Sequence, residues 1–105
     1  MLVLTTCGSA ADAKSLAALL VEQRLAACVN ALDNVMSTYR WQGRVHQDQE
    51  TLLVIKTTVA RYPAVEQAIR AHSKYELPEV LAIPIAAGSG PYLDWVRESV
   101  AGNED

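Results

Sequence analysis

The chain has 105 residues, of which 50% are hydrophobic and 20% charged, and its formal net charge at pH 7 is −3. This length fits one domain with a modest core, so we treat residues 1–105 as a single domain. The acidic balance argues against a nucleic-acid-binding surface, and no apolar run approaches the roughly 20 residues of a membrane span. Two cysteines and no targeting segment favour a cytoplasmic protein with reduced thiols.

The start of the chain predicts a strand and then a helix. Leu2 to Thr6 is apolar and β-branched, which is typical of a buried strand. Ser9, with an acidic residue three positions later at Asp12, resembles a capping box. Apolar residues then recur at helical spacing until the helix ends near Arg24.

The next segment predicts a long hairpin. Residues 25–41 and 44–58 both favour strand, Gln42-Gly43 supplies the turn, and Asp33-Asn34 fits a bulge or bend. The second strand spans about 15 residues, or roughly 50 Å when extended, whereas a domain of this size has a radius of gyration of about 13 Å. The hairpin should therefore extend beyond its own domain.

A protruding hairpin exposes strand edges that pair with another chain. Tyr39 and Trp41 lie beside its turn, and Tyr and Trp are enriched at protein interfaces. We therefore predict a homo-oligomer in which Tyr39, Trp41 and Trp95 lie at the interface. The alternative is that a bulge near Asp33 or Gln47 folds the hairpin back onto its own sheet.

The second half predicts a helix, a strand and a closing helix. Tyr62, Val65, Ile69 and His72 share a helical face, a strand spans residues 80–85, and a last helix follows residues 88–91. Residues 100–105 should fray. The order of elements predicts an α+β, ferredoxin-like βαββαβ fold with an added C-terminal helix, in which a four-stranded antiparallel sheet carries both internal helices on one face.

Five segments in unbroken order resemble the CutA family of divalent-cation tolerance proteins: RLAACVN (24–30), YRWQGRV (39–45), LLVIKTT (52–58), YELPEVLAIPI (75–85) and PYLDWV (91–96). The resemblance implies a homotrimer whose long hairpins pair around the axis, a link to copper and other divalent metals, and a fold-level analogy to PII-type signal proteins.

The chain departs from the family at its candidate metal ligands. Ser73 stands where the family often has histidine, and His72 lies one residue earlier. A cysteine proposed as a copper ligand in some members falls at Thr5, and Gly8 replaces a common proline after Cys7.

Soft donors suggest three residues for a copper or other divalent-cation site: Cys7, His72 and His46. We expect Cys7 to matter more than Cys28, because it ends a strand before a helix and should be the more exposed thiol. The alternatives are that both cysteines are small buried hydrophobes, that His46 is solvated and that His72 is half buried on its helix.

Lys56, Tyr75 and Glu76 are the candidates for a cleft between subunits. Lys56 interrupts an apolar strand, and a buried lysine needs a partner, which could be a ligand or a carboxylate across the interface. No catalytic motif is present, so an enzyme built on these three residues is unmotivated.

The sequence thus supports a trimeric divalent-metal tolerance protein that binds copper weakly or takes part in a metal response, with no organic cofactor. The alternative is a PII-like trimer that senses a small molecule or a partner protein at its inter-subunit clefts.

Overall fold

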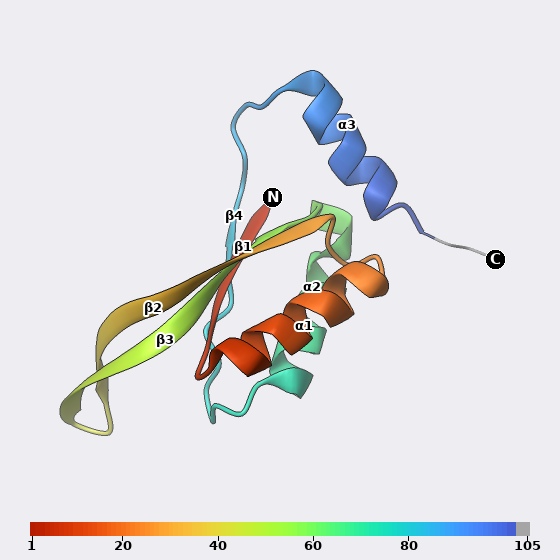
Figure 1. Cartoon of the computed structure of the whole chain (residues 1–105). Coiled ribbons are helices and arrows are strands. Elements are labelled where there is room, and N and C mark those ends of the chain that lie inside the picture. The colour runs from red at the N-terminus through yellow and green to blue at the C-terminus, as the bar shows by residue number, and fades with distance from the viewer. Residues whose placement is uncertain (103–105) are drawn as a thin grey trace.

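The computed structural model describes residues 1–102 and has the α+β, ferredoxin-like architecture that the sequence predicted (Figure 1). The four strands form one antiparallel sheet in the order β2-β3-β1-β4. The elements in chain order are β1 (Leu2–Cys7), α1 (Ala10–Glu22), β2 (Cys28–Trp41), β3 (Arg44–Lys56), a 3-10 turn (Val59–Arg61), α2 (Tyr62–His72), β4 (Leu81–Ile83) and α3 (Gly90–Ser99).

Local sequence signals determine where α1 begins and ends. Ser9 has an extended backbone, and its side chain accepts a hydrogen bond from the Asp12 backbone N–H at 3.1 Å, as an N-cap does. Arg24, just past the helix, adopts a positive φ of 58°, the left-handed conformation that commonly ends a helix. The predicted cap and helix end are therefore confirmed.

The core lies between the sheet and the two helices that cover one of its faces (Figure 1). Alternate residues of β1 and β3 point toward α1 and α2, as the period of a strand requires. The largest fully buried apolar side chains are Leu16, Leu20, Leu53, Ile55, Ile69, Val3 and Val65.

The face of the sheet opposite α1 and α2 is also apolar. The strand register places seven large apolar side chains on this open face: Leu2, Leu4, Leu32, Leu52, Val54, Leu81 and Ile83. Leu32, Leu81 and Ile83 are exposed. Helix α3 lies at one end of this face, where the Lys56 ammonium approaches the Tyr92 ring, and its Val96 and Val100 pack with Ala27 in a small separate core.

The hairpin extends beyond the rest of the sheet. β1 pairs with β3 only at residues 51–56, so residues 35–50 form a two-stranded ribbon that gives the molecule extents of 46 × 30 × 21 Å (Figure 1). A register shift between Leu32 and Val35, with Asn34 at φ 61°, confirms the predicted bulge. Gln42 and Gly43 both have positive φ, as a tight hairpin turn with matching twist requires.

Some predicted boundaries were too generous. β3 ends at Lys56 rather than Thr58, and β4 covers only residues 81–83 of the predicted 80–85. Pro84, which has no N–H to donate, follows directly after β4. At the predicted frayed end, Val100 is buried and its carbonyl accepts a 2.8 Å hydrogen bond from Arg61 Nε. Residues 103–105 lie outside the part of the chain that the structure describes.

Candidate functional site

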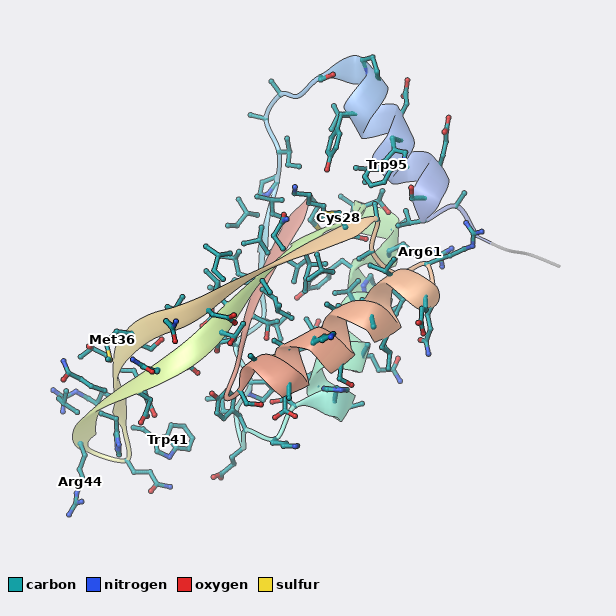
Figure 2. The ribbon with its side chains drawn as sticks, viewed as in Figure 1. Cys28, Met36, Trp41, Arg44, Arg61 and Trp95 are labelled. Atoms are coloured by element: carbon teal, nitrogen blue, oxygen red, sulfur yellow. The ribbon has the colours of Figure 1, made fainter. Side chains whose placement is uncertain are left out.

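A cavity of about 570 Å³ lies between the protruding hairpin and the loop after α2. Figure 2 shows Trp41 beside the hairpin turn, on the side that faces this loop. We call this space the hairpin cavity. Its lining residues are Thr6, Ser37, Thr38, Tyr39, Arg40, Trp41, Glu50, Tyr75, Glu76, Leu77 and Glu79.

Tyr75 connects the two walls of the hairpin cavity. Its hydroxyl donates a 2.6 Å hydrogen bond to Oε2 of Glu50 on β3. Burial, and then the neighbouring Glu50 carboxylate, raise the pKa of Tyr75 well above its ordinary value. The phenol therefore stays protonated at physiological pH and remains a donor to Glu50.

Tyr39 is held on the hairpin by two contacts. Its hydroxyl donates a hydrogen bond to Asp48, and this bond raises the pKa of Tyr39. Its ring stacks on His46, with ring centroids 5.4 Å apart and planes inclined by 17°. His46 and Asp48 thus position an aromatic wall of the hairpin cavity.

The hairpin cavity carries excess negative charge. Three glutamates line it, at positions 50, 76 and 79, and Arg40 is the one basic residue among its lining residues. Within residues 1–102, none of the three carboxylates has a Lys or Arg nitrogen within 4.0 Å. These acidic groups are therefore not neutralised by ion pairs inside the described chain.

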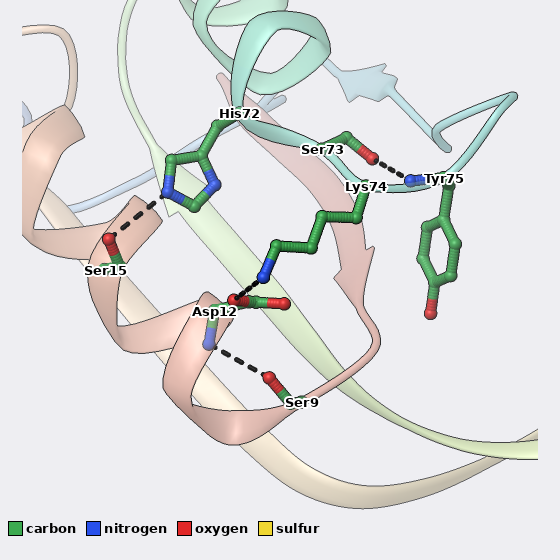
Figure 3. A network of polar contacts seen from close by, with 7 residues as sticks. All are labelled: Ser9, Asp12, Ser15, His72, Ser73, Lys74 and Tyr75. Carbon is green, nitrogen blue, oxygen red and sulfur yellow. Dashed lines mark hydrogen bonds and ion pairs between the residues drawn. The ribbon is translucent and has the colours of Figure 1, made fainter.

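A second, smaller cavity of about 290 Å³ lies beside the start of α1. In Figure 3 two contacts join α1 to the end of α2 and the loop after it: Ser15 Oγ lies 3.2 Å from His72 Nε2, and Lys74 Nζ donates to Asp12 Oδ1 at 3.0 Å. The Lys74 hydrogen bond lowers the pKa of Asp12. We call this space the α1 cavity; Thr6 and Tyr75 line both cavities, so the two adjoin.

Cys7 lines the α1 cavity but is nearly inaccessible, with 8% of its surface exposed. Burial raises the pKa of its thiol, and the Asp12 and Glu50 carboxylates raise it further. Cys28 is only half buried. The expectation that Cys7 is the more exposed thiol is therefore wrong, because the strand end lies under the loop after α2 rather than in solvent.

The structure brings together only two of the three predicted metal ligands. Cys7 and His72 line the α1 cavity, whereas His46 lies on the hairpin against Tyr39. Among residues 1–102, no group of three His, Cys, Asp or Glu side chains is arranged to hold a metal ion. Two donors, one a largely protonated thiol, make at most a weak cation site within one chain.

Lys56 does not join Tyr75 and Glu76 within one chain. Its ammonium lies 5.7 Å from the centroid of the Tyr92 ring, near α3, while Tyr75 and Glu76 line the hairpin cavity. Trp95 also lies on α3 (Figure 2), where its ring contacts Tyr92 with centroids 5.4 Å apart.

The three predicted cleft residues did not include Glu50, Glu79 or Arg40, which also line the hairpin cavity. Alternation along β3 places Asp48 and Glu50 on one strand face near the hairpin turn, but it favours solvated carboxylates there and does not indicate a cavity. Residues 1–102 contain no helix with the length and apolarity needed to cross a membrane.

Comparison with known proteins identifies the family of this chain. The chain matches the CutA1 divalent ion tolerance protein family over residues 1–99. It is 48% identical to the divalent-cation tolerance protein CutA of Thermus thermophilus over 97 residues, which cover 92% of this chain and 94% of that protein. Human Protein CutA is 43% identical over 93 residues, 89% of this chain, but the chain spans only about half (52%) of the human protein.

Solved structures show the same fold. The divalent cation tolerance protein of Thermus thermophilus superposes with a TM-score of 0.93 at 47% identity, covering 95% of this chain and 97% of that one. The periplasmic divalent cation tolerance protein CutA of Archaeoglobus fulgidus superposes with a TM-score of 0.91 at 32% identity, covering 94% and 96%. The chain therefore belongs to the CutA1 divalent ion tolerance family.

Proposed function

We propose that the protein acts in divalent-metal tolerance by binding copper or another divalent cation weakly. The observation that carries this proposal is that Cys7 and His72 line one cavity, which adjoins a second cavity whose three glutamates form no ion pair within residues 1–102. Copper stands near the top of the divalent affinity series, so a loose set of sulfur, nitrogen and oxygen donors favours it over manganese. The small number of converging donors makes the binding weak.

A copper(II) titration by calorimetry tests this proposal, with Cys28→Ser as the matched control. Cys7→Ser and His72→Gln should each weaken binding several-fold, whereas Cys28→Ser should leave it unchanged. Affinities that are equal in all four proteins would remove the α1 cavity from the copper site.

The proposed active form is a homotrimer in the cytoplasm. The apolar open face of the sheet and the protruding hairpin support self-association, since both leave strand surface without a partner inside the chain. In this assembly Tyr39, Trp41 and Trp95, which are exposed or half buried in the single chain, lie between subunits. Two free cysteines fit a reducing compartment, and cell fractionation tests the location.

The second candidate function is ligand sensing at the hairpin cavity, as in a PII-like trimer. Its volume of about 570 Å³ falls in the range of small-molecule sites, roughly 300–1,000 Å³, and three aromatic residues line it. A thermal-shift screen of metabolites, with and without Glu79→Gln, tests whether any of them binds there.

A further inference from the structure

The hairpin cavity combines aromatic rings with unneutralised carboxylates. Tyr39, Trp41 and Tyr75 supply the rings, and Glu50, Glu76 and Glu79 supply the acids. Aromatic faces attract organic cations through their quadrupole, most strongly at Trp, and carboxylates accept hydrogen bonds from ammonium groups. Both kinds of lining residue therefore favour the same chemical class of ligand.

Several of these groups are held in place within the chain itself. Tyr75 donates to Glu50 at 2.6 Å, which ties the loop after α2 to β3. Tyr39 is fixed by its hydrogen bond to Asp48 and by its stacking on His46. Binding to a preformed wall costs less ordering entropy than binding to mobile side chains.

The charge of the cavity selects among ligand classes. Its lining residues carry three carboxylates and one guanidinium, a net charge of about −2, so an anionic ligand is repelled. A bare divalent ion gains little from aromatic faces, and within residues 1–102 no three His, Cys, Asp or Glu side chains are arranged to hold a metal ion. An organic dication has two separated positive charges, each of which can contact a glutamate carboxylate, while the hydrocarbon chain between them contacts the aromatic rings.

We propose that the hairpin cavity binds a small aliphatic ammonium compound, and that a diammonium compound binds best. This inference rests on the second candidate function, ligand sensing, and gives its ligand a chemical class.

Fluorescence titration of the whole chain tests the proposal. A Trp95→Phe background, used once light scattering shows that its mass equals that of the wild type, leaves Trp41 as the single tryptophan, so emission reports on the cavity wall directly. The probe is 1,4-diaminobutane; 1,4-butanediol is the neutral compound of the same length, and Mg²⁺ is an inorganic ion of the same charge. We expect a saturable change in emission with the diamine at a concentration at least tenfold below that needed with the diol or with Mg²⁺.

Matched variants locate the site. Glu79→Gln should weaken diamine binding at least threefold, whereas Glu98→Gln, which removes the same charge from an exposed position on α3, should leave it unchanged. Trp41→Leu should also weaken diamine binding, measured by calorimetry, because it removes an aromatic face that attracts the ammonium group. Equal binding of diamine and Mg²⁺, or equal effects of the two glutamate variants, would overturn the inference.

Failure of the ammonium proposal can be distinguished from failure of ligand sensing or of copper binding. If a neutral or anionic metabolite stabilises the wild type and Glu79→Gln abolishes its effect, ligand sensing stands and the ammonium inference is overturned. The copper titration uses Cys7 and His72 of the α1 cavity and is read independently.

Discussion

Cys7 shows how the position of a single side chain changes the interpretation of a sequence motif. A cysteine between a strand and a helix N-terminus can be reactive, because the helix dipole stabilises a thiolate. Here burial and two carboxylates, Asp12 and Glu50, act in the opposite direction and raise the thiol pKa. Asp12 lies on α1 and Glu50 on β3, whereas Cys7 ends β1. The sequence alone therefore could not have shown that both carboxylates lie near the thiol.

We predict that Cys7 reacts slowly with thiol reagents in the folded protein. In a Cys28→Ser variant, Cys7 is the remaining thiol, and labelling with Ellman's reagent at pH 8 should be at least tenfold slower in native buffer than in denaturant. Because the folded pKa lies above the unfolded pKa, the native rate should increase at higher pH than the rate in denaturant. Equal rates in the two solutions would contradict the burial of this thiol.

The Asp12–Lys74 pair predicts a pH-dependent contribution to stability. The hydrogen bond from Lys74 lowers the pKa of Asp12 below its ordinary value of 3.8, so the folded state favours the carboxylate. This contribution is fully present above about pH 5 and is lost as the pH falls through the lowered pKa. Asp12→Asn should therefore lower the free energy of unfolding at pH 7 and have a smaller effect at pH 3.

Urea unfolding at the two pH values measures this difference. Lys74→Gln removes the same pair from the other side and should show the same pH dependence. A deficit in Asp12→Asn that does not change with pH would show that the contact does not depend on ionisation.

At the scale of elements, the sequence predicted the helix cap and the β-bulge, but it did not show which residues far apart in the chain lie together in one subunit. The Ser9 cap and the Asn34 bulge involve residues close in the chain, and their side-chain chemistry determines their backbone. In contrast, Lys56 and Tyr75 were predicted to meet in a cleft between subunits. Within one chain Lys56 lies near α3 and Tyr75 beside the hairpin, so the cleft between subunits stays a prediction.

The bulge in β2 constrains the residue at position 34. Asn34 has φ 61°, a conformation that asparagine and glycine adopt with little strain but that a β-branched residue avoids. Asn34→Val should lower the free energy of unfolding by about 1–2 kcal/mol, and Asn34→Gly should be nearly neutral.

Asn30→Val is the control, because Asn30 is an exposed residue in the regular part of the same strand. It should be neutral or mildly stabilising, since valine favours strands. Urea midpoints that are equal for Asn34→Val and Asn30→Val would show that the bulge does not constrain the residue at position 34.

At the scale of the whole molecule, the sheet has a buried face and an apolar open face. The first packs under α1 and α2 and was predicted from helical and strand periodicity. The second follows from β1 and β3, which carry apolar residues on both faces, as strands buried on both sides do. The hairpin overhang, predicted from length alone, extends this unpaired surface beyond the domain. The number of subunits does not follow from either feature, since both describe a surface and not its symmetry.

The open face gives a matched test of assembly. Leu32 lies on this face and is 47% exposed, and Val21 lies on α1 and is 43% exposed, so the two positions differ mainly in their location. If the open face is the interface, Leu32→Lys places three charges in a symmetric trimer at sites that exclude water, which is costly without partners. Val21→Lys places the same charge on a solvated helix surface.

We expect multi-angle light scattering to give a mass near three times 11.4 kDa for the wild type and for Val21→Lys. Leu32→Lys should shift the mass toward that of one subunit at micromolar concentration, while circular dichroism still reports a folded chain. This separation of assembly from folding is expected because Leu32 is outside the core formed by α1, α2 and the sheet. A wild-type mass near 11.4 kDa would contradict the trimer, and an unchanged mass for Leu32→Lys would move the interface away from the open face.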